Sequence, residues 1–207
     1  MTYKLIYLDH HLVLDCPELG KPFYIDFQKI RYQAKNAALK NELLAKAVGI
    51  KKNILPNICD LTAGFGQDAY LLYSLGCKVN LVERSPIIAA LLKEGLERAG
   101  CEMELYIGEA IDYLDNLNKI KNFPDVIYFD PIFPQKTKSA LAQKHARLLR
   151  AVVGDDADST KVFEAALKSA KNRVVVKRPL HAQNISDKLM PDIIYKGKTI
   201  RFDVYLK

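Results

Sequence analysis

The chain has 207 residues, of which 49% are hydrophobic, so it can bury one substantial core. Its apolar runs are shorter than the roughly 18 to 20 residues of a membrane span, and the N-terminus lacks the apolar segment of a secretory signal, so a cytoplasmic protein is expected. An excess of 31 Lys and Arg over 24 Asp and Glu gives a net charge of +7, which suits a polyanionic partner but does not establish one.

The N-terminal part differs from the rest of the chain in its pattern of predicted strands and helices. The runs KLIYLDHHLVL and PFYIDF indicate two or three short strands, and residues 28–48 form a basic, helix-prone stretch. We interpret residues 1–50 as an N-terminal extension, with β and helical parts, that packs on a main domain formed by residues 51–207.

The main domain alternates between short β-rich runs and helical patterns. The β-rich runs are 57–61, 78–83, 103–107, 125–130, 173–178, 192–196 and 200–206, and the helical patterns are 67–75, 86–99, 109–118, 139–153 and 159–171. This alternation predicts an α/β fold with a seven-stranded, mostly parallel sheet and helices on both faces. A short turn separates the last two strands, so the final strand should run antiparallel.

The segment CDLTAGFGQDAYLLYSLG carries the first candidate site. Asp60 ends a strand, and a loop of small residues with Gly64 and Gly66 then leads into a helix, where the backbone can approach a ligand closely. The loop is not the GxGxxG of dinucleotide-binding proteins. A carboxylate such as Asp60 would repel a pyrophosphate but suits a cationic, amine-bearing cofactor, and S-adenosylmethionine has an amino group and a sulfonium.

Two further acids follow the next strands. Glu83 comes 23 residues after Asp60 and could accept hydrogen bonds from both hydroxyls of a ribose. Glu109 could receive the adenine amine, with Asp112 as its rival. The structural alternatives are that Asp60 only caps its turn and that Glu83 only pairs with a neighbouring cation. Acids at the ends of three successive strands favour a nucleoside-containing ligand.

The segment DVIYFDPIFPQKTKSAL, residues 125–141, carries the second candidate site. Asp130 ends the fourth strand, which lies beside the first in a doubly wound sheet, at the point where a crevice opens. Asp130 and the carbonyl of Pro131 or Ile132 could accept the two hydrogens of an exocyclic amine, and Phe133 could stack on the base. Held in this way, the amine would aim its lone pair at a methyl donor. Asp130, Pro131 and Phe133 are therefore the catalytic candidates.

Four motifs together give a resemblance to a known family. DLTAGFGQDAYLL, LVERSPIIAALL, YFDPIFPQKTKSAL and VVVKRP are similar to the ribosomal small-subunit methyltransferase J family, over about residues 22–205. The resemblance implies a class I methyltransferase fold, Rossmann-like, and methylation of the N2 amine of a guanosine in 16S rRNA by S-adenosylmethionine. It also implies cofactor contacts at Gln67, Asp68, Glu83, Arg84, Glu109, Ala110 and Asp130. The Asp-Pro corner, residues 130–133, has Ile132 where the wider pattern of amine methyltransferases has a second proline.

Basic residues near the second site could hold RNA phosphates. The predicted contacts are Lys136, Lys138, Lys144, Arg147, Lys177 and Arg178, with Arg150 on the same helical side. A second basic cluster, Lys29, Arg31, Lys35 and Lys40 around Tyr32, could clamp RNA from the N-terminal extension. In both cases the alternative is an ordinary solvated helix face.

The sequence leaves competing functions open. A methyltransferase acting on adenine, a protein amide or a small amine, a Rossmann oxidoreductase, and a non-catalytic RNA-binding module all fit parts of the pattern. The four cysteines show no CxxC pair and the histidines no ligand spacing, so reduced, packed thiols and no metal are expected. The expected partner is 16S rRNA or the small ribosomal subunit, without a membrane. The sequence does not predict an oligomeric state.

Overall fold

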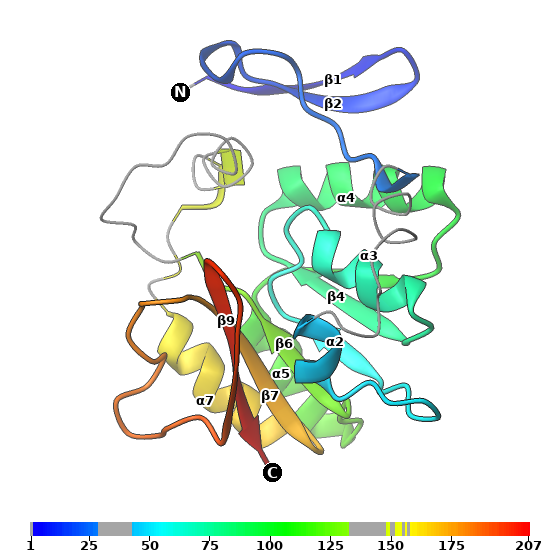
Figure 1. Ribbon diagram of the computed structural model, residues 1–207. Helices are drawn as coiled ribbons and strands as arrows, with labels where there is room; N and C mark the ends of the chain where they lie inside the picture. Colours follow the sequence, from blue (N-terminus) through cyan, green and yellow to red (C-terminus); the bar gives the residue numbers. More distant parts are fainter. Residues whose placement is uncertain (1, 29–42, 133–147, 150–151, 155, 157) are drawn as a thin grey trace.

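The computed structural model describes residues 2–28, 43–132, 148–149, 152–154, 156 and 158–207 (Figure 1). Most of the helix predicted at 139–153 lies outside these residues. So do Phe133, the basic residues Lys136, Lys138, Lys144, Arg147 and Arg150, and the whole N-terminal basic cluster.

Within the described residues, seven strands form one sheet, and they match the predicted runs closely. They are β3 (Ile58–Asp60), β4 (Val79–Glu83), β5 (Glu104–Ile107), β6 (Val126–Phe129), β7 (Arg173–Pro179), β8 (Ile193–Lys196) and β9 (Ile200–Leu206). Their order is β5-β4-β3-β6-β7-β9-β8. The first five are parallel, and β9 enters antiparallel between β7 and β8, which confirms the predicted closing hairpin.

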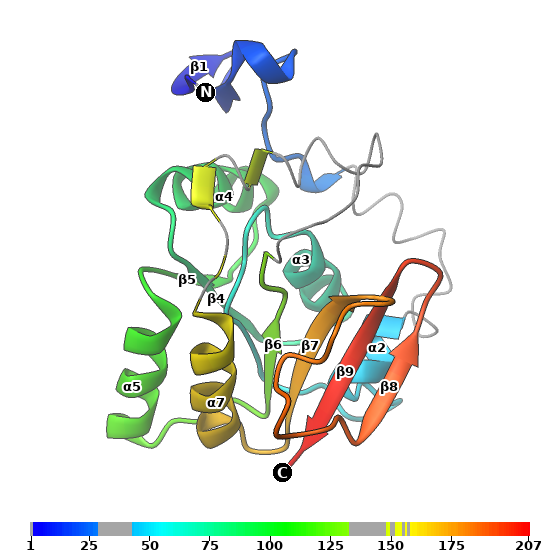
Figure 2. The same cartoon turned by 90° about the vertical axis from the view of Figure 1, so that its left-hand side faces the viewer.

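Helices cover both faces of the sheet, as predicted (Figure 2). On one face lie α2 (Leu43–Val48), α3 (Gln67–Ser74) and α4 (Pro86–Ala99), and on the other α5 (Ala110–Ile120) and α7 (Ser159–Ser169). Side chains alternate between the two faces, so Ile58 and Tyr128 join one hydrophobic cluster and Cys59 and Ile127 join the other. The central strands are buried on both faces, which explains their continuous apolar sequences.

The N-terminal part begins with a hairpin of β1 (Lys4–Leu8) and β2 (His11–Asp15) that lies beyond α4 in Figure 1. Asp9 and His10 both have positive φ, 48° and 64°, as a tight two-residue turn requires. A short helix, η1 (Pro17–Leu19), follows. Of the two or three short strands predicted here, the two in KLIYLDHHLVL are confirmed, whereas PFYIDF makes only an isolated bridge between Phe23 and Leu14.

The chain after the hairpin enters the core of the main domain. Ile25 and Phe27 are buried, and the Phe27 ring stacks on Tyr70 of α3 with ring centroids 4.6 Å apart. Leu14 and Val48 belong to the same hydrophobic cluster as Ile58 of the sheet. The division of the chain at residue 50 stays a prediction.

The described residues contain neither a membrane-spanning helix nor a disulfide. No described helix has the length and apolar character needed to cross a membrane. The four cysteines all lie in the described residues and none forms a disulfide; Cys16, Cys59 and Cys77 are buried.

Candidate active site

A cavity of about 300 Å³ opens where β3, β4, β6 and β7 end, beside the switch point between β3 and β6. Nine of the ten predicted cofactor residues line it; the exception is Glu109. The lining includes Asp60, Gly64, Gly66, Gln67, Asp68, Glu83, Arg84, Ala110, Asp130, Ile132, Asp156, Asp158 and Lys177. Residues chosen from separate motifs therefore lie around one space.

The two glycines of the loop have different roles. Gly64 has φ +52° and its N–H donates to Oε2 of Glu83 at 2.8 Å. Gly66 has φ +72°, and an added Cβ would lie 2.6 Å from Cδ1 of Leu92 and 3.0 Å from Cζ of Phe27. Gly66 is thus required for close packing with α4 and the N-terminal segment, a reason that the sequence did not show.

Glu83 is fixed by the backbone at the end of β4. Only 4% of the residue is exposed, and its two oxygens accept the N–H groups of Gly64 and Ser85, both at 2.8 Å. Burial raises the pKa of its carboxyl. Each carboxylate oxygen has two lone pairs, so Glu83 can still accept ribose hydroxyls at the cavity wall.

Asp60 is buried at the end of β3, between its own turn and the cavity. Its Oδ1 accepts the backbone N–H of Thr62 at 3.0 Å, so it does cap the turn, and it also lines the cavity. Only 2% of the residue is exposed, and this burial raises its pKa to about 8. A ligand ammonium placed beside Asp60 would stabilise the ionised form, which fits the amino group of S-adenosylmethionine.

Arg84 does not pair with Glu83 but is held by three other carboxylates. Its guanidinium nitrogens lie 2.7 Å from Glu109, 3.0 Å from Asp156 and 2.7 Å from Asp158. The side chain of Glu109 is 54% exposed at the rim of the site. The adenine contact expected of Glu109 therefore has no support from its position, and its rival Asp112 is exposed and does not line the cavity either.

Asp156 and Asp158 are functional-site residues that were not predicted from the sequence. They belong to VVGDDADST, just before α7, where acids are common as helix caps. The density of aspartates in this short stretch was the available signal. Their partners, Arg84 and Ile132, are distant in sequence and become neighbours only through the fold.

Lys177 is at the centre of a half-buried charge cluster. Its Nζ lies 2.7 Å from Oδ2 of Asp68 and 3.0 Å from Oδ2 of Asp130. The Tyr128 hydroxyl also donates to Oδ2 of Asp68, at 2.6 Å. Burial opposes the charge on Lys177, but Asp130 and Asp68 outweigh it, so the pKa of the ammonium is raised.

The RNA contacts predicted at the end of β7 need correction. Lys177 lies inside the cavity, paired with two carboxylates, and is not presented to a phosphate. Arg178 is 5% exposed and donates to the carbonyl of Gln183. Successive residues of a strand point to opposite faces, so the two side chains could not both have faced the crevice.

The Asp-Pro corner is fixed at both ends. The N–H of Asp130 donates to Oγ1 of Thr62 at 2.7 Å, and the N–H of Ile132 donates to Oδ2 of Asp156 at 2.6 Å. The carbonyl of Ile132 accepts the N–H of Asp156 at 3.2 Å, and Pro131 is buried. Ile132 lines the cavity, and its carbonyl keeps a second lone pair after accepting from Asp156, so the carbonyls of both Pro131 and Ile132 stay candidates for the second acceptor of an amine.

The parallel sheet with an antiparallel β9, and the acids around a cavity at its switch point, define a class I S-adenosylmethionine-dependent methyltransferase. The whole chain, residues 1–207, matches the family model described as "Putative SAM-dependent methyltransferase". It is 42% and 45% identical to the ribosomal RNA small subunit methyltransferases J of Nitrosococcus oceani and Thioalkalivibrio sulfidiphilus, over 99% of this chain and 84% and 85% of theirs. The chain therefore belongs to the ribosomal RNA small subunit methyltransferase J family.

A solved structure agrees with this assignment. The crystal structure of a SAM-dependent methyltransferase from Neisseria gonorrhoeae matches with a TM-score of 0.75 and 32% identity, over 95% of this chain and 79% of that one. The family match includes the N-terminal hairpin, so the resemblance begins earlier than the predicted residue 22. S-adenosylmethionine is thus the cofactor of this family, and the wall formed by Glu83, Asp60 and the loop at Gly64 fits it.

Proposed function

We propose that this protein methylates the exocyclic N2 amine of a guanosine in 16S ribosomal RNA, as a cytoplasmic enzyme acting on the small-subunit RNA. The observation that carries the proposal is the position of Asp130, which lines the same cavity as Glu83 and the glycine loop. The names of the relatives, which refer to small-subunit ribosomal RNA, support the substrate class.

The residues of the corner would act by holding the amine. The lone pair of an aryl amine is delocalised into the ring, and acceptors for both amine hydrogens favour a pyramidal nitrogen that can attack. Asp130 and the carbonyl of Pro131 or Ile132 would supply these acceptors. The cofactor supplies a methyl group on a sulfonium. Lys177, 3.0 Å from Oδ2 of Asp130, fixes that carboxylate, whose oxygens can accept further hydrogen bonds.

The direct test is methyl transfer to RNA from a strain that lacks the enzyme. Purified protein and S-adenosylmethionine with a tritiated methyl group are incubated with undermethylated 16S rRNA or with small subunits, and the nucleosides are then separated. We expect label in N2-methylguanosine. Label in an adenosine or a protein amide would mean that the enzyme methylates that group and not guanine N2. Tight NAD binding without stabilisation by S-adenosylhomocysteine would favour the oxidoreductase alternative.

Glu83→Ala is expected to weaken S-adenosylhomocysteine binding by about 10-fold or more, because a hydrogen bond to a charged group contributes about 1.5–3 kcal/mol. Isothermal titration calorimetry measures this affinity. Glu97→Ala is the matched control, since Glu97 is a glutamate of α4 whose side chain is 68% exposed. Equal affinity of Glu83→Ala and the wild type would remove Glu83 from the cofactor site.

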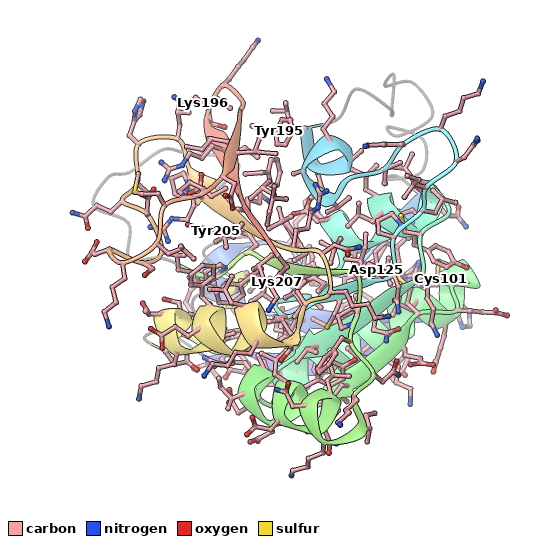
Figure 3. The ribbon with its side chains drawn as sticks, turned by 90° about the horizontal axis from the view of Figure 1, so that it is seen from below. Cys101, Asp125, Tyr195, Lys196, Tyr205 and Lys207 are labelled. Atoms are coloured by element: carbon pink, nitrogen blue, oxygen red, sulfur yellow. The ribbon has the colours of Figure 1, made fainter. Side chains whose placement is uncertain are left out.

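A surface for RNA phosphates beside the site is predicted at the turn between β8 and β9. Lys196 and Lys198 are exposed there, and Lys196 lies at the outer edge of the molecule in Figure 3. Ile200, the next strand residue, pairs with Pro179 at the carboxyl end of β7, so the turn lies at the same edge of the sheet as Asp130. At about 4.8 Å per strand, it is on the order of 10 Å from β7.

Reversing these two charges, by Lys196→Glu with Lys198→Glu, should raise KM for RNA about 10-fold and make it less dependent on salt, because fewer phosphates are contacted. Affinity for S-adenosylhomocysteine should stay unchanged. Lys119→Glu with Lys121→Glu changes the net charge equally at the end of α5, on the opposite edge of the sheet. An equal rise in KM for both double variants would show a general charge effect and no site at the turn.

A further inference from the structure

Asp156 joins two parts of the site that different motifs supply. Its Oδ1 accepts Nη1 of Arg84 at 3.0 Å, and its Oδ2 accepts the backbone N–H of Ile132 at 2.6 Å. Its own backbone N–H donates to the Ile132 carbonyl at 3.2 Å. The side chain is 10% exposed. One residue thus contacts both polar groups of the Ile132 backbone and the arginine that follows Glu83.

Among the residues that the structure describes, two backbone N–H groups hold the corner. Asp130 is held through its N–H by Thr62, and Pro131 has no N–H to donate. The next backbone donor is that of Ile132, and Asp156 accepts it. The orientation of the Pro131 carbonyl, which lies between these two fixed points, therefore depends on the bond to Asp156.

Asp158 provides a natural comparison. It binds the same guanidinium, at 2.7 Å, and comes from the same stretch before α7. Its side chain is 37% exposed and makes no capping hydrogen bond to α7. In the part of the chain that the structure describes, Asp156 but not Asp158 also forms hydrogen bonds to the Ile132 backbone, of 2.6 and 3.2 Å, so it contacts the corner directly. Because Glu109 and Asp158 remain on Arg84, loss of Asp156 leaves that arginine with two carboxylates.

We infer that Asp156 is a positioning residue for the methyl acceptor: it fixes the Pro131–Ile132 backbone so that the acceptor carbonyl faces the amine, and it couples this corner to Arg84. The inference rests on the proposed function, since it assigns Asp156 a part in presenting the same amine. A displacement of about 1 Å in a reacting group can lower a rate by about 100-fold, so a single hydrogen bond at this point has a measurable effect.

The test compares Asp156→Ala, Asp156→Asn and Asp158→Ala with the wild type. In Asp156→Ala we expect kcat for methyl transfer to RNA to fall at least 10-fold, while the Kd for S-adenosylhomocysteine changes less than 3-fold. Asp158→Ala removes a carboxylate from the same arginine but no bond to Ile132, so it should lower kcat less than Asp156→Ala does. Asp156→Asn should recover most of the loss, because the amide oxygen can still accept the Ile132 N–H although the neutral side chain no longer pairs with Arg84.

A second measurement needs no substrate. Hydrogen exchange of the Ile132 amide, followed by NMR in the cofactor-free protein, should be at least 10-fold faster in Asp156→Ala and unchanged in Asp158→Ala. Unchanged exchange in Asp156→Ala, or an equal loss of kcat in the two alanine variants, would overturn the inference. So would a loss that appears only in the affinity for S-adenosylhomocysteine. Failure of the wild type to methylate guanine N2 would instead refute the proposed function, and the exchange result would still stand.

Discussion

Asp130→Ala should lower the rate of methyl transfer by about 100-fold or more, on the order of 3 kcal/mol in the activation free energy, as expected for loss of one preorganised polar contact. The affinity for S-adenosylhomocysteine should fall much less, because Glu83 and the glycine loop remain. Folding should also be retained, since Lys177 keeps its bond of 2.7 Å to Asp68. Single-turnover transfer of a tritiated methyl group to undermethylated rRNA measures the rate.

Asp130→Asn separates the two functions of the carboxylate. The amide oxygen can still accept an amine hydrogen, but the neutral side chain no longer forms an ion pair with Lys177. We therefore expect Asp130→Asn to be more active than Asp130→Ala. Thermal unfolding of both variants shows whether they are folded. A folded Asp130→Ala protein with the wild-type rate would exclude Asp130 from the mechanism.

The fold was predictable because its signals are local. A parallel strand buried on both faces gives a continuous apolar run, and each such run here is followed by a polar or charged residue at the edge of the sheet. Pro86 and Ser85 mark the start of α4, where the Ser85 side chain accepts the N–H of Ile88, and Gly100 ends it with φ +64°. These features depend only on neighbouring residues.

The partners of the charged residues were not predictable in the same way. The end of β7 was located correctly, yet Lys177 binds Asp68 and Asp130, which precede it by many residues. Asp156 likewise acts through Arg84 and Ile132. Such pairs form only when the helices and strands have packed. The prediction for Arg178 could have been better, because strand alternation already separates it from Lys177.

The second large effect is expected for Lys177→Met. Three carboxyls, those of Asp60, Asp68 and Asp130, line the cavity around one ammonium. Because the side chains of Asp68 and Asp130 are 30% and 38% exposed, water partly screens the charge left without its partner, and its removal costs on the order of 1–2 kcal/mol, less than for a fully buried pair. We expect the free energy of unfolding of the cofactor-free protein, measured with urea at pH 8, to fall by about this amount. Methyl transfer should be lost as well, since Asp130 is no longer held.

The pH dependence of the stability loss distinguishes loss of the Lys177 charge from a packing defect. Burial raises the pKa values of Asp60 and Asp130 in the folded protein, and loss of Lys177 raises them further, so the folded state binds protons more tightly than the unfolded chain. Stability then decreases as pH rises through the range between the ordinary carboxyl pKa and that of Asp60, which is about 8 even with Lys177 present. The deficit of Lys177→Met relative to the wild type should therefore be larger at pH 8 than at pH 5.5.

Two control variants accompany this measurement. Lys177→Arg, which keeps the charge, should lose less stability. Lys171→Met, at an exposed lysine just before β7, should show no such trend. A deficit that does not change with pH would mean that Lys177 acts through packing, because only the charge of the ammonium couples its loss to proton binding by Asp60 and Asp130.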